Sequence, residues 1–228
     1  MREIVLDTET TGLDPNAGHR IVEIAGVELM NSVPTGQVFQ RYINPERDMP
    51  EEAFAIHGLS DSFLREHPLF ASIVDELLGF IGDATLVIHN AEFDMRFINA
   101  ELARCERAPL GAERAMCTLQ LARRRFPGTQ VSLDALCRRF GVDNTQRTKH
   151  GALLDAELLA EVYLELIGGR QHGLELAAAA ARVAAIERVL RPARPHAPTV
   201  DELAAHAVLL AQLKEPLWMR GEASTGTA

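Results

Sequence analysis

The sequence predicts an α/β domain, and two alternating patterns carry this prediction. Short apolar runs at Ile4–Leu6 and Leu86–Ile88 are each followed by polar residues, which is typical of buried strands that end at a ligand site. Between these runs, apolar residues recur at helical spacing over residues 69–81. Because strand and helix patterns mix through residues 1–168, we expect one α/β domain over this range.

The first strands are expected to form an antiparallel meander. After the opening run, Ile21–Leu29 and Val38–Ile43 are apolar and β-branched enough to form two further strands. We place the turn between them at Gly36. Pro45 and Pro50 then end the strand region.

Helical patterns dominate the rest of the domain. The expected elements are a short helix at 52–59, a capped turn at Ser60, the helix over 69–81, a strand at 86–88, a helix to about Arg107, a strand at 116–118, a helix to Phe126, a helix capped by Ser132 over 133–140, and a long helix from about 150 to 168. The arginines of these helices form either solvated faces or nucleic-acid contacts; they are Arg123, Arg124, Arg125, Arg138 and Arg139.

The last sixty residues have a different composition. Residues 169–198 read as a linker that holds an Ala-rich helical stretch and a Pro-rich spacer, which cannot be helical. Thr199 and Glu202 form a capping box that opens a final helix to about Lys214. We therefore expect a mostly helical C-terminal region over 199–228.

Composition excludes several classes of protein. The net charge of −9 argues against broad electrostatic binding of nucleic acid, although an enzyme that takes a single strand end is still compatible with it. The sequence lacks an 18-residue apolar run and a signal-peptide layout, so we expect no membrane span. The three cysteines lack metal-type spacing, which is typical of a reduced, cytoplasmic protein.

Carboxylates close to the predicted strand ends point to a metal site. Asp7 and Glu9 lie two residues apart, so both side chains point to one face of a strand. Asp94 follows the strand at 86–88, and Asp155 lies on the last helix of the domain. On that helix His150 would diverge from Asp155 by about 140°, so we expect His150 in the preceding loop.

Each of these residues alone also has an ordinary structural interpretation, such as a solvated strand end or a helix cap. Together they suit metal-assisted phosphodiester hydrolysis, because hard cations prefer several oxygen ligands and a nearby imidazole can take a proton from water.

Three segments carry a resemblance to a known family. DTETTG at 7–12, HNAEFD at 89–94 and HGALLD at 150–155 match, in order and spacing, the motifs of the DEDDh 3′–5′ exonucleases. The resemblance covers residues 1–168 and implies an RNase H-like mixed sheet flanked by helices. Residues 132–137 and 150–163 are more specifically similar to the proofreading epsilon subunits of bacterial DNA polymerase III.

The resemblance implies a role for each matching residue. Two divalent ions, Mg²⁺ or Mn²⁺, would be held by Asp7, Glu9, Asp94 and Asp155, with Asp7 shared and His150 as general base. The expected contacts to the terminal nucleotide are Asp7, Glu9, Thr10, Leu13, Glu52, His57, Asn90, Phe93 and Asp155, of which Phe93 could equally be only core.

The C-terminal region implies partners. Gln171, Leu174 and Leu176 resemble the peptide that bacterial proteins insert into the sliding clamp (beta), although a simple linker is the alternative. Trp218 would anchor the polymerase alpha subunit, or pack on its own helix. We also consider a small accessory subunit as a partner, beside a DNA 3′ end.

Two other functions stay open at the level of the motifs. A free-standing nuclease that trims RNA or other single-stranded 3′ ends would use the same chemistry. A binding module without catalysis is disfavoured, because all five acid and base residues are present.

Overall fold

The computed structural model describes residues 1–147, 149–168 and 197–214. Its elements are β1 (Arg2–Thr10), η1 (Pro15–Ala17), β2 (Ile21–Met30), β3 (Val33–Tyr42), α1 (Glu51–His57), α2 (Asp61–Leu64), α3 (Phe70–Ile81), β4 (Thr85–Ile88), α4 (Ala91–Arg104), η2 (Ala112–Arg114), β5 (Ala115–Cys117), α5 (Thr118–Arg125), α6 (Leu133–Phe140), α7 (Ala152–Leu166) and α9 (Val200–Gln212). The chain divides into two units, Met1–Gly173 and Leu174–Ala228. Within the described ranges, no helix is both long and apolar enough to cross a membrane.

The five strands form one mixed sheet in the order β3-β2-β1-β4-β5. β1 pairs antiparallel with β2, and β2 with β3, which confirms the predicted meander. β4 pairs parallel with both β1 and β5. The mixed α/β sheet expected from the sequence is therefore confirmed.

The turn between β2 and β3 lies earlier than predicted. Asn31 and Ser32, with φ of 51° and 63°, make the turn, so the prediction of a turn at Gly36 and a strand from Val38 was wrong. Asn tolerates left-handed backbone because its short amide side chain bonds locally. Gly36, with φ of 84°, lies inside β3, close to the register shift between Val27 and Leu29.

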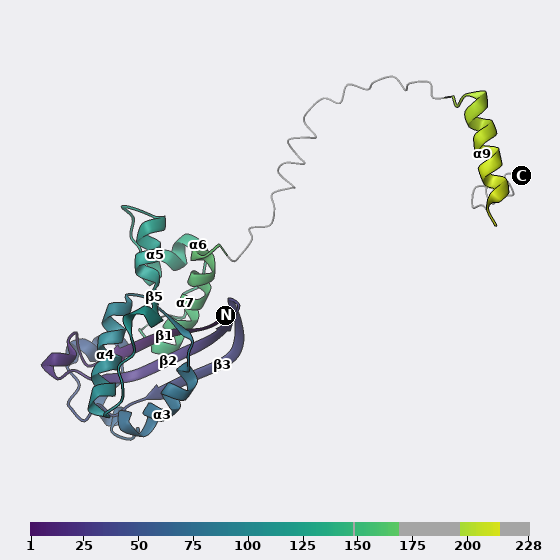
Figure 1. Ribbon diagram of the computed structural model, residues 1–228. Coiled ribbons are helices and arrows are strands. Elements are labelled where there is room, and N and C mark those ends of the chain that lie inside the picture. The colour runs from purple at the N-terminus through teal and green to yellow at the C-terminus, as the bar shows by residue number, and fades with distance from the viewer. Residues whose placement is uncertain (148, 169–196, 215–228) are drawn as a thin grey trace, which may run out of the picture. The chain divides into compact units, whose positions relative to one another are not determined.

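Alternate residues of the strands pack into two cores on opposite faces of the sheet. Ile4 and Leu6 of β1 lie in a core with residues of α3 and α4, whereas Val5 lies in a second core with residues of α6 and α7. Figure 1 shows α3 and α4 on one side of the sheet and α7 on the other. Side chains on opposite faces of β1 therefore meet different helices.

Several helix starts follow the sequence. Ser60 and Ser132 each accept a hydrogen bond from a backbone N–H of the first turn, as predicted. α7 begins only at Ala152, which leaves His150 in the preceding loop, also as predicted. These helices therefore begin close to the positions that the sequence predicted.

The described part of the second unit is α9. Thr199 and Glu202 form the predicted capping box, in which the Glu202 backbone N–H donates to Thr199 Oγ1 at 3.3 Å. The predicted clamp peptide, the Ala-rich stretch and Trp218 lie outside the described residues; the named positions are Gln171, Leu174, Leu176 and Trp218.

Candidate active site

One face of β1 brings Asp7 and Glu9 to α7. The register is marked by Tyr163 of α7, whose hydroxyl donates to Glu3 Oε1 at 2.6 Å in a buried contact. Because side chains alternate along a strand, Glu3, Asp7 and Glu9 all face this helix. Asp155 lies about two helical turns before Tyr163, and therefore next to the C-terminal end of β1, where Asp7 and Glu9 lie.

Asp94 reaches the same end of β1 from α4. Thr8 Oγ1 donates to Asp94 Oδ1 at 2.7 Å, and both side chains are buried. Asn90, with φ of 68° and ψ of 50°, makes the left-handed turn from β4 into α4. This short connection directs Asp94 toward the end of β1, as the sequence predicted.

The carboxylates of this cluster are crowded; Glu9, Asp94 and Asp155 are buried, and Asp7 is half-buried. Burial, followed by the charges of Asp94 and Glu9, raises the pKa of Asp7 well above its usual value. Burial and the charge of Asp155 raise the pKa of Glu9 to about 8. Burial raises the pKa of Asp94 to about 7, against the hydrogen bond from Thr8. The cluster therefore carries more negative charge than its own surroundings balance.

Arg147 places a positive charge inside the carboxylate cluster, and the sequence analysis missed it. Its Nε donates to Asp155 Oδ1 at 2.5 Å, and its Nη2 donates to Asp155 Oδ2 at 2.6 Å. Nη1 donates to Asp134 Oδ1 of α6 at 2.8 Å. Burial would raise the pKa of Asp155, but these bonds from Arg147 lower it overall. No periodic pattern marks a single arginine in a loop.

His150 lies at the exposed rim of the cluster. Its backbone N–H donates to the Ile56 carbonyl at 3.2 Å, which ties the loop to α1. Its Nδ1 accepts from Arg147 Nη2 at 2.8 Å and lies 3.4 Å from Asp155 Oδ2. The side chain is 49% exposed, so the ring is accessible from solvent.

The donor set fits a divalent cation. One ligand atom each from Glu9, His150 and Asp155 lies within 4.8 Å of the others. Asp7, which is half-buried, and Asp94, which is buried, add two carboxylates whose pKa values are raised first by removal from water. Several oxygen ligands and an uncompensated negative charge are what Mg²⁺ or Mn²⁺ requires.

A second buried glutamate supports the cluster and was also missed. Glu23 of β2 lies opposite Glu9 in the strand register and is 2% exposed. It accepts from the Ala152 backbone N–H at 3.1 Å and from Gln40 at 2.8 Å, so it holds the start of α7. The sequence contained one signal for this residue, because Glu23 is an acid inside the apolar run Ile21–Leu29, where an acid is expected to be buried with hydrogen-bond partners.

The predicted nucleotide contacts differ in their exposure. Thr10 is buried and donates to the Gly12 carbonyl at 2.7 Å, whereas Leu13 is 78% exposed. His57 is buried at the end of α1, where burial and the charge of Lys149 lower its pKa. Glu52 is exposed on α1.

Phe93 does not stand free in the site. It is half-buried against the core of α4, and its ring centroid lies 5.0 Å from that of Phe97. Phe93 therefore packs partly in the core, which was the alternative to a nucleotide contact that the sequence left open.

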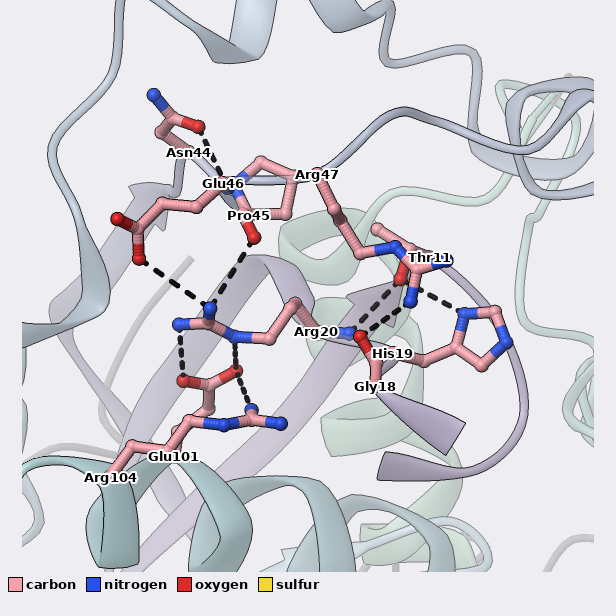
Figure 2. Close-up of polar contacts among 10 residues, drawn as sticks. All are labelled: Thr11, Gly18, His19, Arg20, Asn44, Pro45, Glu46, Arg47, Glu101 and Arg104. Atoms are coloured by element: carbon pink, nitrogen blue, oxygen red, sulfur yellow. Dashed lines mark hydrogen bonds and ion pairs between the residues drawn. The ribbon is translucent and has the colours of Figure 1, made fainter. Parts of the chain in front are cut away.

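The loop that carries Leu13 is fastened to α4 by a buried ion pair (Figure 2). Arg20 donates through Nε and Nη2 to both oxygens of Glu101, at 2.6 and 2.9 Å, and Glu101 is 1% exposed. The Arg20 backbone N–H donates to Thr11 Oγ1 at 3.0 Å, and Arg104 adds a second cation to Glu101 at 3.0 Å. Because α4 also carries Asp94, the loop and the carboxylate share one support.

Comparisons with known proteins agree with this geometry. Residues 4–163 match the exonuclease family RNase_T. The chain is 57% identical over 179 residues to DNA polymerase III subunit epsilon of Rickettsia felis (strain ATCC VR-1525 / URRWXCal2), covering 77% of this chain and 78% of the relative. It is 43% identical over 225 residues to DNA polymerase III subunit epsilon of Escherichia coli (strain K12), covering 92% of each.

Solved structures share the fold. Exonuclease X in complex with 5′ overhanging duplex DNA is 25% identical, with a TM-score of 0.56 over 73% of this chain and 92% of that one. The nuclease domain of 3′hExo, a DEDDh family member bound to rAMP, is 17% identical, with a TM-score of 0.62 over 73% and 92%.

Proposed function

The chain belongs to the exonuclease family of the DNA polymerase III epsilon subunits, which are 3′–5′ proofreading exonucleases, and from this premise we propose how its residues divide the reaction. The observation that carries the proposal is the convergence of four carboxylates and one imidazole at the end of β1. These residues are Asp7, Glu9, Asp94, Asp155 and His150. The reaction is removal of a mispaired 3′-terminal nucleotide by hydrolysis of its phosphodiester bond.

Divalent metal ions serve the DEDDh exonucleases, and the carboxylates of this chain suit two of them. Asp7, Glu9 and Asp155 would hold one ion, and Asp94 would join Asp7 at the other. When bound, Mg²⁺ or Mn²⁺ supplies a water of lowered pKa and balances the charge of the attacking and leaving oxygens. The buried position of the carboxylates strengthens their hold on such ions.

His150 would act as the general base. Its exposed side chain lies at the rim of the carboxylate cluster, and imidazole is the side chain that most often serves as a general base. Arg147 Nη2 now donates to Nδ1, which leaves the ring proton on Nε2. For Nε2 to accept a proton from water, the neutral ring must carry its own proton on Nδ1. The hydrogen bond from Arg147 is then broken, and Nδ1–H can donate to Asp155 Oδ2, which lies 3.4 Å away.

The rim residues would grip the terminal nucleotide. Leu13, 78% exposed, offers an apolar surface for the base or sugar, and His57 and Thr10 border the carboxylates. Glu52, Asn90 and Phe93 complete the predicted set of contacts. Fraying of a mispaired end supplies the single strand that such a pocket takes.

The partners of this enzyme are a DNA 3′ end and DNA polymerase III. Within that assembly, we assign Trp218 to the alpha subunit and Gln171, Leu174 and Leu176 to the sliding clamp (beta), while a small accessory subunit remains a further candidate. Tethering of this kind raises the local concentration of the enzyme at the primer end, so a chain of net charge −9 needs no strong DNA affinity of its own. Bacterial replication places this work in the cytoplasm.

The testing experiment is degradation of a 5′-labelled single-stranded DNA and a matched RNA, with and without Mg²⁺. We expect a 3′-to-5′ ladder on DNA that disappears without metal and in Asp7→Ala. A ladder on RNA alone would support the trimming nuclease instead. Absence of any ladder from the folded chain would overturn the catalytic assignment.

A further inference from the structure

A basic groove runs along α5 and α6, next to the candidate active site. Its first part is a hollow of about 950 Å³ lined by His89, Asn90, Arg123 and residues 128–132. Its second part shares Gln130 and is lined by Ala135, Arg138 and Arg139. We call the two parts together the basic groove. Because Asn90 also opens α4, the groove begins beside the turn that positions Asp94.

The lining of the groove contains arginines and no carboxylate. This is unusual surface for a chain with net charge −9. The acid next to it in sequence, Asp134, is held by Arg147 at 2.8 Å and by Asn144 at 3.0 Å. The positive charge of the groove is therefore not balanced by its own walls.

The groove arginines are not engaged in structural ion pairs. Among the described residues, Arg123, Arg138 and Arg139 are exposed and take part in no salt bridge, unlike Arg20 or Arg147. Arg139 lies over the Phe126 ring at 4.4 Å, which restrains its side chain.

Arg125 lies on α5, as Arg123 does, but its guanidinium is engaged, because it donates to the backbone carbonyls of Glu165 and Leu166. The groove arginines are thus available to a ligand.

His89 adds a neutral donor or acceptor at the entrance. Its Nδ1 lies 3.0 Å from Thr118 Oγ1, which fixes the ring. Burial and the nearby charge of Arg123 lower its pKa to about 4, against a hydrogen bond with the Val131 backbone. At neutral pH the charge of this part of the groove therefore comes from Arg123.

We propose that the basic groove binds the phosphodiester backbone of the substrate strand upstream of its 3′-terminal nucleotide. The proposal rests on the proposed function, since it assumes that the terminal nucleotide lies among the carboxylates beside Asn90. A strand leaving that site along the groove passes Arg123 and the exposed residues 128–130 in the first part, and Arg138 and Arg139 in the second. Spaced arginines that track a backbone, without base-specific contacts, are how proteins bind single strands of any sequence.

The test compares a substrate that has upstream phosphates with one that has none. The substrates are an oligothymidylate of about twelve nucleotides and the p-nitrophenyl ester of thymidine 5′-monophosphate. In Arg123→Ala and in Arg138→Ala/Arg139→Ala, we expect KM for the oligonucleotide to rise about three- to tenfold, while KM and kcat for the ester stay unchanged. Arg124→Ala is the matched control, because Arg124 is exposed on the same helix but lines a different hollow.

A binding measurement separates this proposal from the proposed function. Anisotropy of the labelled oligonucleotide is followed against salt in an Asp7→Asn background, where the strand is not degraded. Each arginine removed from the groove should lower the salt slope of log K by about 0.7. The proposal would be overturned if the groove variants left the salt slope and KM unchanged, or if Arg124→Ala had an effect equal to theirs. Failure of the unmodified chain to cleave either substrate would instead overturn the proposed function, and the anisotropy would still test the groove.

Discussion

Arg147 clasps Asp155 through two hydrogen bonds, of 2.5 and 2.6 Å, and both side chains are almost fully buried. The same guanidinium reaches Asp134 of α6 and Nδ1 of His150. A single cation thereby joins α6, α7 and the loop before α7, and it balances part of the charge that divalent ions would otherwise balance.

Removal of this cation should destabilise the metal-free domain. In Arg147→Ala, Asp155 and Asp134 lose their partner, and breaking a buried pair costs about 3–5 kcal/mol of unfolding free energy. Urea denaturation in EDTA measures the loss. The exposed pair Arg65–Asp61 supplies the control, since Arg65→Ala should cost no more than about 1 kcal/mol.

Metal should then rescue the variant more than it stabilises the unmodified chain. A divalent ion replaces the missing positive charge at Asp155. Equal stabilisation of both proteins by Mg²⁺ would mean that Arg147 and the ion do not share this carboxylate.

His150→Gln separates a general base from a metal ligand. Loss of a base should slow kcat about 10²- to 10⁴-fold and leave the affinity for Mn²⁺ nearly unchanged. Because His150 also lies within ligand distance of Glu9 and Asp155, calorimetric titration with Mn²⁺ is the deciding measurement. A drop in Mn²⁺ affinity as large as the drop in kcat would make His150 a ligand.

The sequence predicted what depends on local patterns. The strand at Ile4–Leu6, the caps at Ser60 and Ser132, and the placement of His150 before α7 all follow from periodicity, capping chemistry and helix geometry. Strand alternation placed Asp7 and Glu9 on one face, whereas the expectation that Asp155 joins them came from the resemblance of the three motifs to the DEDDh exonucleases.

What the sequence did not predict depends on long-range contacts. Arg147 and the pair Arg20–Glu101 gain their roles from partners brought close only by the fold, the latter separated by 81 residues in sequence. The hairpin error has a local cause, because Asn31 and Ser32 compete with Gly36 for the turn and neither pattern excludes the other.

The raised pKa of Glu9 makes the metal-free protein less stable as pH rises. An unfolded Glu loses its proton near 4.5, whereas folded Glu9 keeps it up to about 8. Between these values the folded state binds more protons, so stability falls by up to about 1.4 kcal/mol per pH unit and levels off above the window. Urea midpoints in EDTA from pH 5 to pH 8 measure the slope, which Glu9→Gln should reduce, while Asp7 and Asp94 keep a part of it. A flat profile in the unmodified chain would contradict the assignment.

Asp7→Asn should lower the rate of hydrolysis and raise the stability of the metal-free protein. The variant removes a half-buried carboxyl group whose charged form burial, Asp94 and Glu9 all disfavour, so the metal-free protein should be more stable than the unmodified chain at pH 8. Hydrolysis should fall at least about 10²-fold, because the shared ligand is lost. Asp83→Asn, at an exposed position after α3, should change neither quantity. Loss of stability in Asp7→Asn would mean that Asp7 has a favourable partner in the metal-free fold.

Glu101→Gln should loosen the loop that carries Leu13 without touching the carboxylate cluster. Gln keeps the size of the side chain but leaves Arg20 and Arg104 without their shared anion. We expect KM for single-stranded DNA to rise severalfold, kcat to change less, and amide exchange of Thr11 and Arg20 to quicken while α7 stays protected. Asp75→Asn breaks a comparable but exposed pair with Arg107 and should leave the loop unchanged. Exchange that quickens equally throughout the domain would show a global role for Glu101 in stability, because a support specific to the loop changes only the amides it holds.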